Sequence, residues 1–287
     1  MRFNDNLYNW YTCSGVRVAY FFLATNTGYK LYDVAEGVIA SKPTSGFFEF
    51  IRNLSPNLRR LYLSDVVLRT PVPDTVEFLS VSNSCVTAGA FQALPRPGGQ
   101  AVTRRLLEME LSEVTLLQNT LRALPNSVER LRIRSTDLRQ LIYSAPNAQR
   151  LRELDVSGCT LWLFTAVQHI SRFAPQLTTL KINHTGASDL RRVELLPRLE
   201  VLEADNTNCN CDDLQSICTY LSSTLRSLSL ARCQKLKAAD FLVLVELRNS
   251  LRFLDVSSTN INAYVIDTLS SCMPDCVIVH SADMPAE

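Results

Sequence analysis

The most regular feature of the chain is the apolar pattern L-x-x-L-x-L, in which Val, Ile, Met or Ala replaces some of the leucines. The pattern occurs nine times, and its first residues are Leu58, Val76, Leu106, Val128, Leu151, Leu177, Leu199, Leu225 and Leu251. Successive matches lie 18 to 30 residues apart, about 24 on average. Periods of this length are typical of solenoids, so we expect one structural repeat for each match.

Each repeat predicts a short strand. Its fourth and sixth residues are two apart, so on a strand both side chains point to the same face. Stacked repeats would then form a parallel sheet, whose inward side chains make one continuous core that no single repeat could bury alone. With strands ~4.8 Å apart, eight gaps predict an exposed sheet face ~38 Å long.

The residues that follow each strand also repeat. The ninth position, three residues after the last apolar position of the pattern, usually carries a hydroxyl or a thiol, which can turn inward and bond backbone groups. Its occupants are Val66, Ser84, Val114, Thr136, Cys159, Thr185, Thr207, Cys233 and Thr259. Apolar residues further along are spaced as on one face of a helix. They are Leu161, Phe164, Val167, Ile170, then Leu214, Ile217, Leu221, then Phe241, Leu244, Val245, and finally Val265, Leu269.

Residues 58 to 280 therefore resemble the ribonuclease-inhibitor-like and cysteine-containing subclasses of leucine-rich-repeat proteins. The resemblance implies an α/β fold, a leucine-rich-repeat solenoid shaped as a horseshoe arc, with a parallel concave sheet and a helical convex side. It implies little about function, because this architecture serves many unrelated binding roles.

Two regions depart from the repeat, and they set the expected domains. Residues 1–57 hold 12 of the 23 aromatic residues, so we expect them to form a cap on the open end of the solenoid or a docking segment for a neighbour. Residues 58–287 form the leucine-rich-repeat domain of about nine repeats. Two prolines and a Gly pair near residues 94–105 predict an inserted loop.

Composition narrows the class of protein. With 29 basic and 28 acidic residues, the net charge of +1 gives no excess positive charge for direct, sequence-specific nucleic-acid binding. The longest apolar run near the start, residues 18–24, is too short to insert in a membrane. We therefore expect an intracellular, cytoplasmic protein (a cytoskeletal or flagellar place being compatible), with the mitochondrion as the alternative.

The nine cysteines are an odd number spread along the chain, which favours free thiols over a disulfide framework. Cys209, Cys211 and Cys218 are close enough in sequence to suggest a metal site, but no fourth ligand is near. Structural thiols are the preferred interpretation, and no metal or other cofactor is expected. Cys272 and Cys276 are expected to stay reduced.

Catalytic motifs are missing from the sequence. The three histidines, His169, His184 and His280, are not spaced to build a catalytic triad or a zinc-binding motif, and no phosphate-binding glycine motif occurs. We therefore expect no enzyme.

The fifth residue of each repeat lies between the two inward positions and should face outward. From Glu110 to Glu203 these residues alternate in charge across five strands, which predicts a self-neutralising ladder of ion pairs. Large aromatics beside arginine are the usual anchors of protein interfaces. The predicted partner-binding residues of the concave face are Tyr62, Phe78, Arg130, Arg132, Arg134, Lys181, His184 and Phe253.

The sequence thus predicts a non-catalytic protein-interaction module, acting as a structural or scaffolding subunit of a larger intracellular assembly. One alternative is the substrate-recognition subunit of a ubiquitin ligase, although residues 1–57 lack the Leu-Pro start expected of an F-box. A second alternative is an inhibitor or regulator that binds its partner on the concave face.

Overall fold

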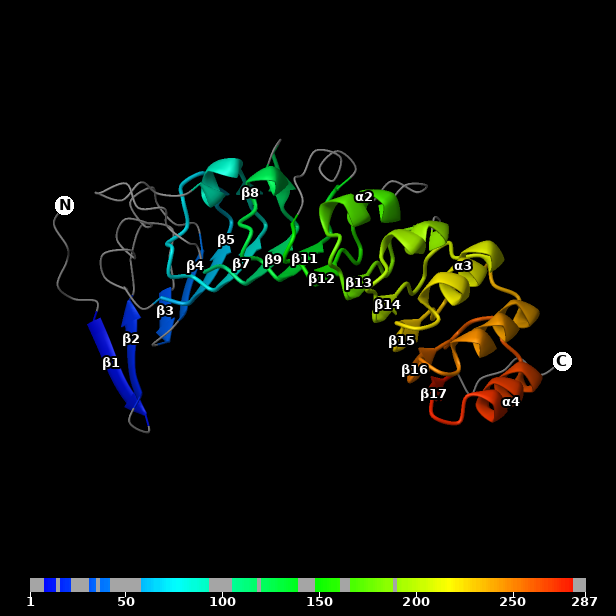
Figure 1. The fold of residues 1–287 in the computed structure, drawn as a ribbon. Coiled ribbons are helices and arrows are strands. Elements are labelled where there is room, and N and C mark those ends of the chain that lie inside the picture. The colour runs from blue at the N-terminus through cyan, green and yellow to red at the C-terminus, as the bar shows by residue number, and fades with distance from the viewer. Residues whose placement is uncertain are drawn as a thin grey trace. The chain divides into compact units, whose positions relative to one another are not determined.

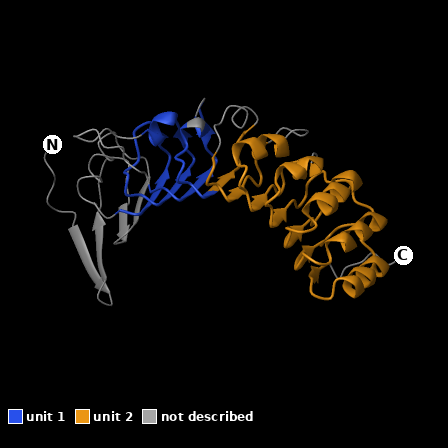
Figure 2. Cartoon of the chain, viewed as in Figure 1, with its two compact units in different colours: residues 1–130 blue, residues 131–287 orange. Residues whose placement is uncertain are grey.

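The structure, a computed structural model shown as a ribbon in Figure 1, describes residues 58–92, 105–117, 120–138, 148–160, 166–187 and 190–280. It also places the backbone of four strands nearer the N-terminus. The chain divides into two compact units, residues 1–130 and residues 131–287 (Figure 2). The side chains of the predicted cap and residues 93–104 of the predicted loop lie outside the described residues, so both stay predictions.

In unit 1, the four strands of the N-terminal segment pair antiparallel in chain order, and the last of them also pairs with the first repeat strand. The segment's strands are β1 (Tyr8–Cys13), β2 (Val16–Phe21), β3 (Leu31–Val34) and β4 (Gly37–Ser41). The first repeats supply β5 (Arg60–Ser64), β7 (Phe78–Ser82) and β9 (Glu108–Ser112). From β4 onward the pairing is parallel, with Leu61 opposite Leu79 and Leu79 opposite Met109.

The opposite side of unit 1 differs from the expected helical layer. It carries a three-stranded parallel sheet of β6 (Val67–Leu68), β8 (Cys85–Val86) and β10 (Thr115–Leu116), with 3-10 helices η1 (Ala88–Phe91) and η2 (Leu121–Ala123). In the described part of this unit the helices of the convex side are therefore short 3-10 turns. The 18-residue spacing of its first two matches leaves too little chain for an α-helix and two connections.

Unit 2 has strands along one face and helices along the other (Figure 1). The strands are β11 (Arg130–Arg134, beginning on the last residue of unit 1), β12 (Glu153–Asp155), β13 (Thr179–Lys181), β14 (Val201–Glu203), β15 (Ser227–Ser229), β16 (Phe253–Asp255) and β17 (Val277–Val279). The helices are α2 (Ala166–Phe173), α3 (Cys211–Leu221), α4 (Ala263–Cys272) and the 3-10 helices η4 (Leu190–Leu195) and η5 (Ala238–Leu247). Strands β12 to β17 pair in parallel. β17 adds a strand beyond the nine predicted.

The core follows the predicted pattern. The side chains at the fourth position of the nine matched repeats are at most 1% exposed. They are Leu61, Leu79, Met109, Leu131, Leu154, Leu180, Leu202, Leu228 and Leu254. The predicted helix faces are buried wherever the structure describes them, except that Val245 is only half-buried. η5 has three residues per turn, so it buries Phe241, Leu244 and Leu247 instead.

A left-handed backbone conformation follows the strand at the eighth position of each matched repeat. Its φ values range from 47° to 71° in all nine matched repeats. The residues are Asp65, Asn83, Glu113, Ser135, Gly158, His184, Asn206, Arg232 and Ser258. This conformation costs a residue with a Cβ about 1–2 kcal/mol, yet eight of the nine positions carry one. The turn is therefore held by its surroundings rather than by glycine.

The ninth-position side chains help to stabilise this turn through hydrogen bonds to the backbone, as the sequence predicted. The Thr185, Thr207 and Thr259 hydroxyls donate to the backbone carbonyls of Ile182, Ala204 and Val256 at 2.6–2.7 Å. Two thiols bond backbone carbonyls of the preceding repeat. Cys159 Sγ lies 3.0 Å from the Ile133 carbonyl, and Cys233 Sγ lies 3.2 Å from the Ala204 carbonyl. These bonds satisfy carbonyl groups that the turn leaves without a strand partner.

Replacing Gly158 with alanine isolates the cost of the left-handed turn. A Cβ at Gly158 would meet nothing within 4 Å, so only the backbone conformation opposes the change. We expect Gly158→Ala to lower the free energy of unfolding by about 1 kcal/mol in chemical denaturation. Ser135→Ala at the same repeat position is the control and should stay within about 0.5 kcal/mol of the unsubstituted chain. Equal effects of the two substitutions would contradict this interpretation.

Candidate functional site

The outward side of the sheet is, in each unit, a surface to which every described repeat strand of that sheet contributes. We call it the sheet face, and it consists of the side chains at the third, fifth and seventh repeat positions. In unit 1 these come from β5, β7 and β9, and the burial along each strand alternates as the two-residue period requires. All eight predicted partner-binding residues except His184 belong to the sheet face of one unit or the other.

Tyr62 and Phe78 lie together on the sheet face of unit 1. Their ring centroids are 5.2 Å apart and the ring planes are tilted by 46°. The contact arises because β5 and β7 pair in parallel, with Arg60 opposite Phe78 and Tyr62 opposite Ser80. The two aromatics, which the sequence predicted as separate contacts, therefore form one half-buried cluster.

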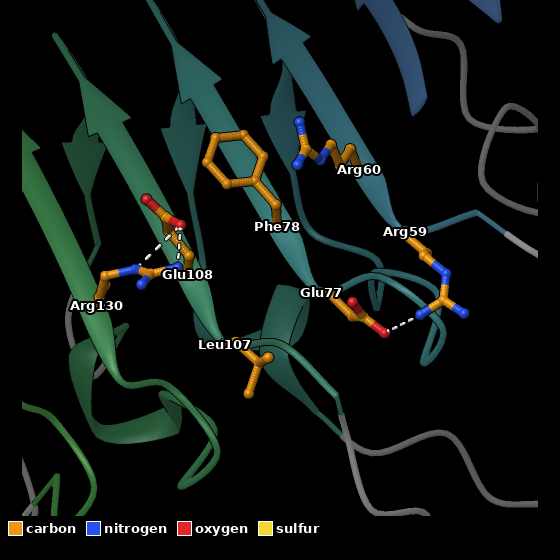
Figure 3. Close-up of a pocket in the computed structure, with 7 residues that line it drawn as sticks. All are labelled: Arg59, Arg60, Glu77, Phe78, Leu107, Glu108 and Arg130. Atoms are coloured by element: carbon orange, nitrogen blue, oxygen red, sulfur yellow. Dashed lines mark hydrogen bonds and ion pairs between the residues drawn. The ribbon is translucent and has the colours of Figure 1, made fainter. Parts of the chain in front are cut away.

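Beside this cluster the surface of unit 1 has a hollow of about 180 Å³ (Figure 3). Phe78 and Leu107 give it apolar walls, and the remaining lining residues are Arg59, Arg60, Glu77, Glu108 and Arg130. Two ion pairs cross it, Arg59 with Glu77, and Arg130 with Glu108 at 2.9 Å. The structure thus gives the predicted residues Phe78 and Arg130 a shared site.

Opposite charges also pair on the sheet face of unit 2, two of the pairs diagonally and one between residues of the same repeat position. Arg132 bonds Glu153 at 3.4 Å, and Arg134 bonds Asp155 at 3.5 Å, so each arginine reaches a residue two positions earlier in its repeat. A long guanidinium side chain can span such a diagonal. Lys181 and Glu203 both hold the fifth position and lie opposite each other on paired strands, with 2.7 Å between Nζ and Oε1.

Four polar side chains tie neighbouring repeats together next to Lys181. Asn183 donates to Glu203 at 3.1 Å and accepts from the backbone N–H of Asp205 at 2.8 Å. The Asp205 carboxylate accepts from the Ser229 hydroxyl and from the backbone N–H of Ala231. Burial raises the pKa of Asp205, and the nearby Asp255 and Glu203 add to that effect. This network fixes the backbone of the face rather than leaving its polar groups free for a ligand.

His184 and Phe253 have different roles from each other. His184 is an eighth-position turn residue, and its Nδ1 lies 2.9 Å from the side-chain nitrogen of Asn206, the next eighth-position residue. Phe253 is 38% exposed on β16, in register with the 62% exposed Val277 of β17. Phe253 therefore belongs to an exposed apolar spot, whereas His184 lies in the turns that end the strands.

The predicted partner-binding residues did not include five residues of the hollow, namely Arg59, Arg60, Glu77, Leu107 and Glu108. The signal was present, because Arg60 holds the third position of its repeat, as Phe78 and Arg130 do. Arg59, Glu77 and Leu107 occupy the second position, just before the strands. That position is outside the two-residue alternation used to select the face.

The cysteine cluster proposed as a metal site is mostly internal. Cys209 and Cys218 are 0% exposed, whereas Cys211 is exposed at the start of α3. Burial raises the pKa of Cys218 to about 12 and that of Cys209 well above its usual value. Among the described residues, no three His, Cys, Asp or Glu side chains are grouped so that they could hold a metal ion. The described arrangement fits structural thiols.

Thiol reactivity should separate these cysteines. Only a thiolate reacts readily with alkylating reagents, and burial raises the pKa of Cys159 to about 11 as well. In the native chain at pH 7.5, we expect iodoacetamide to label the exposed Cys211 and Cys272 at least ten times faster than Cys159, Cys209 or Cys218. Peptide mass spectrometry measures each rate, and unfolding in denaturant should equalise them. Equally fast native labelling of Cys209 and Cys211 would contradict the structure.

The three histidines lie in different places in unit 2. His169 is in α2 and is buried, which lowers its pKa, and Arg172 adds to that effect. His184 follows β13, and His280 follows β17. In the part of the chain that the structure describes, none of the helices has the length and apolarity needed to cross a membrane.

Comparison with known proteins bears on the fold. No model of a known protein family matches this chain, and no curated protein matches it. Among solved structures, the chain is similar to an internalin (inlF) of Listeria monocytogenes, with 20% identity and a TM-score of 0.55, over 83% of this chain and 70% of that one. It also matches internalin C2 (inlC2) of the same organism, with 19% identity and a TM-score of 0.47, over 66% of this chain and 81% of that one. The likeness to the first internalin and the parallel repeat strands show an α/β leucine-rich-repeat solenoid.

Proposed function

Because the chain has the leucine-rich-repeat fold, we propose that it is a non-catalytic protein-interaction module and acts as a structural or scaffolding subunit of a larger intracellular assembly. The sheet face is the proposed contact surface in both units. The cytoplasm is the proposed location, with the mitochondrion as the alternative.

One observation carries this proposal: opposite charges on the sheet face pair across neighbouring strands, while aromatic side chains remain accessible on it. The ion pairs of Arg130, Arg132, Arg134 and Lys181 each join neighbouring strands. Such exposed pairs contribute only about 0.2–1 kcal/mol to stability, but they leave no broad single-sign field of the kind that nucleic-acid binding needs. A preformed surface with aromatic anchors favours protein recognition, because little entropy is lost when it binds.

Native purification of the endogenously tagged protein tests the proposal. The expected result is recovery in a large complex of fixed composition, measured by size-exclusion chromatography and mass spectrometry together. A cullin and its adaptor in the eluate would instead favour the ubiquitin-ligase alternative. A single enzyme or GTPase bound in a one-to-one complex would favour the inhibitor or regulator. A monomer near 32.2 kDa with no stable partner would contradict the structural-subunit role.

Variants on the two sides of the solenoid locate the contact. We expect Phe78→Ala and Arg132→Ala each to weaken recovery of the co-purifying proteins about tenfold, because anchors of this kind contribute 1–2 kcal/mol or more. Tyr220→Ala is the matched control, since Tyr220 is 55% exposed on α3 on the helical side. Quantitative mass spectrometry of the eluates measures the change. If Tyr220→Ala lowered the recovery of the co-purifying proteins and the sheet-face variants did not, the contact would lie on the helical side.

A further inference from the structure

The charge balance of the unit 1 hollow points to a specific kind of ligand. Three arginines and two glutamates line it. Glu77 pairs with Arg59, and Glu108 pairs with Arg130. Arg60 is exposed and has no ion-pair or hydrogen-bond partner for its side chain among the described residues. Counting the described residues, the lining of the hollow therefore carries one positive charge that no carboxylate pairs.

Arg60 stands next to the apolar part of the hollow. It lies directly opposite Phe78 in the pairing of β5 with β7, and Phe78 in turn lies opposite Glu108. Figure 3 shows Arg60 and Phe78 extending from neighbouring strands on the same side of the sheet. Leu107, which is 42% exposed, lies at the start of the next strand. The Arg60 guanidinium thus lies next to the accessible apolar surface of Phe78 and Leu107.

From this arrangement we infer that the hollow binds a protein segment in which an Asp or Glu is flanked by a large apolar side chain. The carboxylate pairs with the Arg60 guanidinium, whose planar donors match carboxylate geometry. The apolar side chain packs against Phe78 and Leu107, and Tyr62 supports the Phe78 ring from β5. This inference rests on the proposed function and adds the chemistry of the partner to it.

The surrounding charges exclude more highly charged ligands. A phosphate group carries about −1.5 to −2 charges, whereas the hollow has only one positive charge beyond its two ion pairs. Glu77 and Glu108 would repel the excess charge. The volume, about 180 Å³, is also below the ~300–1,000 Å³ of typical small-molecule pockets. It suits one or two side chains of a peptide.

Selection from a random peptide library displayed on phage, with the full chain as bait, tests the inference. We expect the selected peptides to share an Asp or Glu next to Leu, Met, Phe or Trp. Arg60→Glu should lower the affinity of a selected peptide at least tenfold in fluorescence titration, and Phe78→Ala should lower it comparably. The loss should shrink as salt rises, because the ion pair is exposed.

Arg69→Glu is the matched control, because it makes the same charge change at an exposed residue of unit 1 that does not line the hollow. It should leave the affinity within twofold. Unchanged thermal unfolding of each variant verifies its fold, and Arg60→Gln replaces Arg60→Glu if the latter unfolds. Selected peptides without an acidic residue, peptides that bind tighter when phosphorylated, or affinity insensitive to Arg60→Glu would overturn the inference.

The two proposals fail in different ways. Peptides whose binding is lost with Lys181→Ala or Phe253→Ala, but kept with Arg60→Glu, overturn the role of the hollow and support the sheet face as a protein-binding surface. No selected peptide, together with no protein partner in the native purification, overturns both.

Discussion

Alignment of one apolar side chain per repeat on paired strands is the constraint on which the rest of the structure depends. Leu180, Leu202 and Leu228 illustrate it, since they face one another in register across β13, β14 and β15 and none is exposed. Burying a leucine gains about 1.5–3 kcal/mol, whereas ordering the backbone costs about 1–2 kcal/mol for every residue. One repeat has too few such side chains to fold alone, so stability comes from stacking.

The same alignment produces the candidate binding surface. A strand that points its fourth and sixth residues into the core must present its third and fifth residues on the opposite side. Neighbouring repeats then bring residues that are distant in sequence into contact, as with Tyr62 and Phe78 or Arg134 and Asp155. The left-handed turn recurs at the eighth position of all nine matched repeats, so the chain leaves the sheet at the same repeat position each time. The sheet face is thus a consequence of the core, and only its side chains are free to specialise.

Much of this could be predicted from the sequence, because the core positions obey a strict period. The strands, the buried leucines and the inward bonds of the ninth-position residues follow from that period alone. The helical side could not be predicted as well, since local length and 3-10 geometry decide whether a residue such as Val245 is buried. The diagonal pairs of Arg132 with Glu153 and of Arg134 with Asp155 were not predicted, because side-chain reach as well as strand spacing selects the partners. The third repeat position placed Arg60 on the sheet face, but a sequence pattern does not reveal that its side chain has no ion-pair partner among the described residues.

The central claim is that partners contact the sheet face in the assembled state. Hydroxyl-radical footprinting of the chain, alone and in its purified complex, tests it directly. Aromatic side chains are oxidised according to their exposure, so one experiment measures protection on both sides of the solenoid. We expect Tyr62, Phe78 and Phe253 to become protected in the complex. Tyr220 on α3 and Tyr264 on α4, which are 55% and 73% exposed in the structure, should keep their reactivity. Protection of Tyr220 and Tyr264 with no change at Tyr62, Phe78 and Phe253 would contradict it.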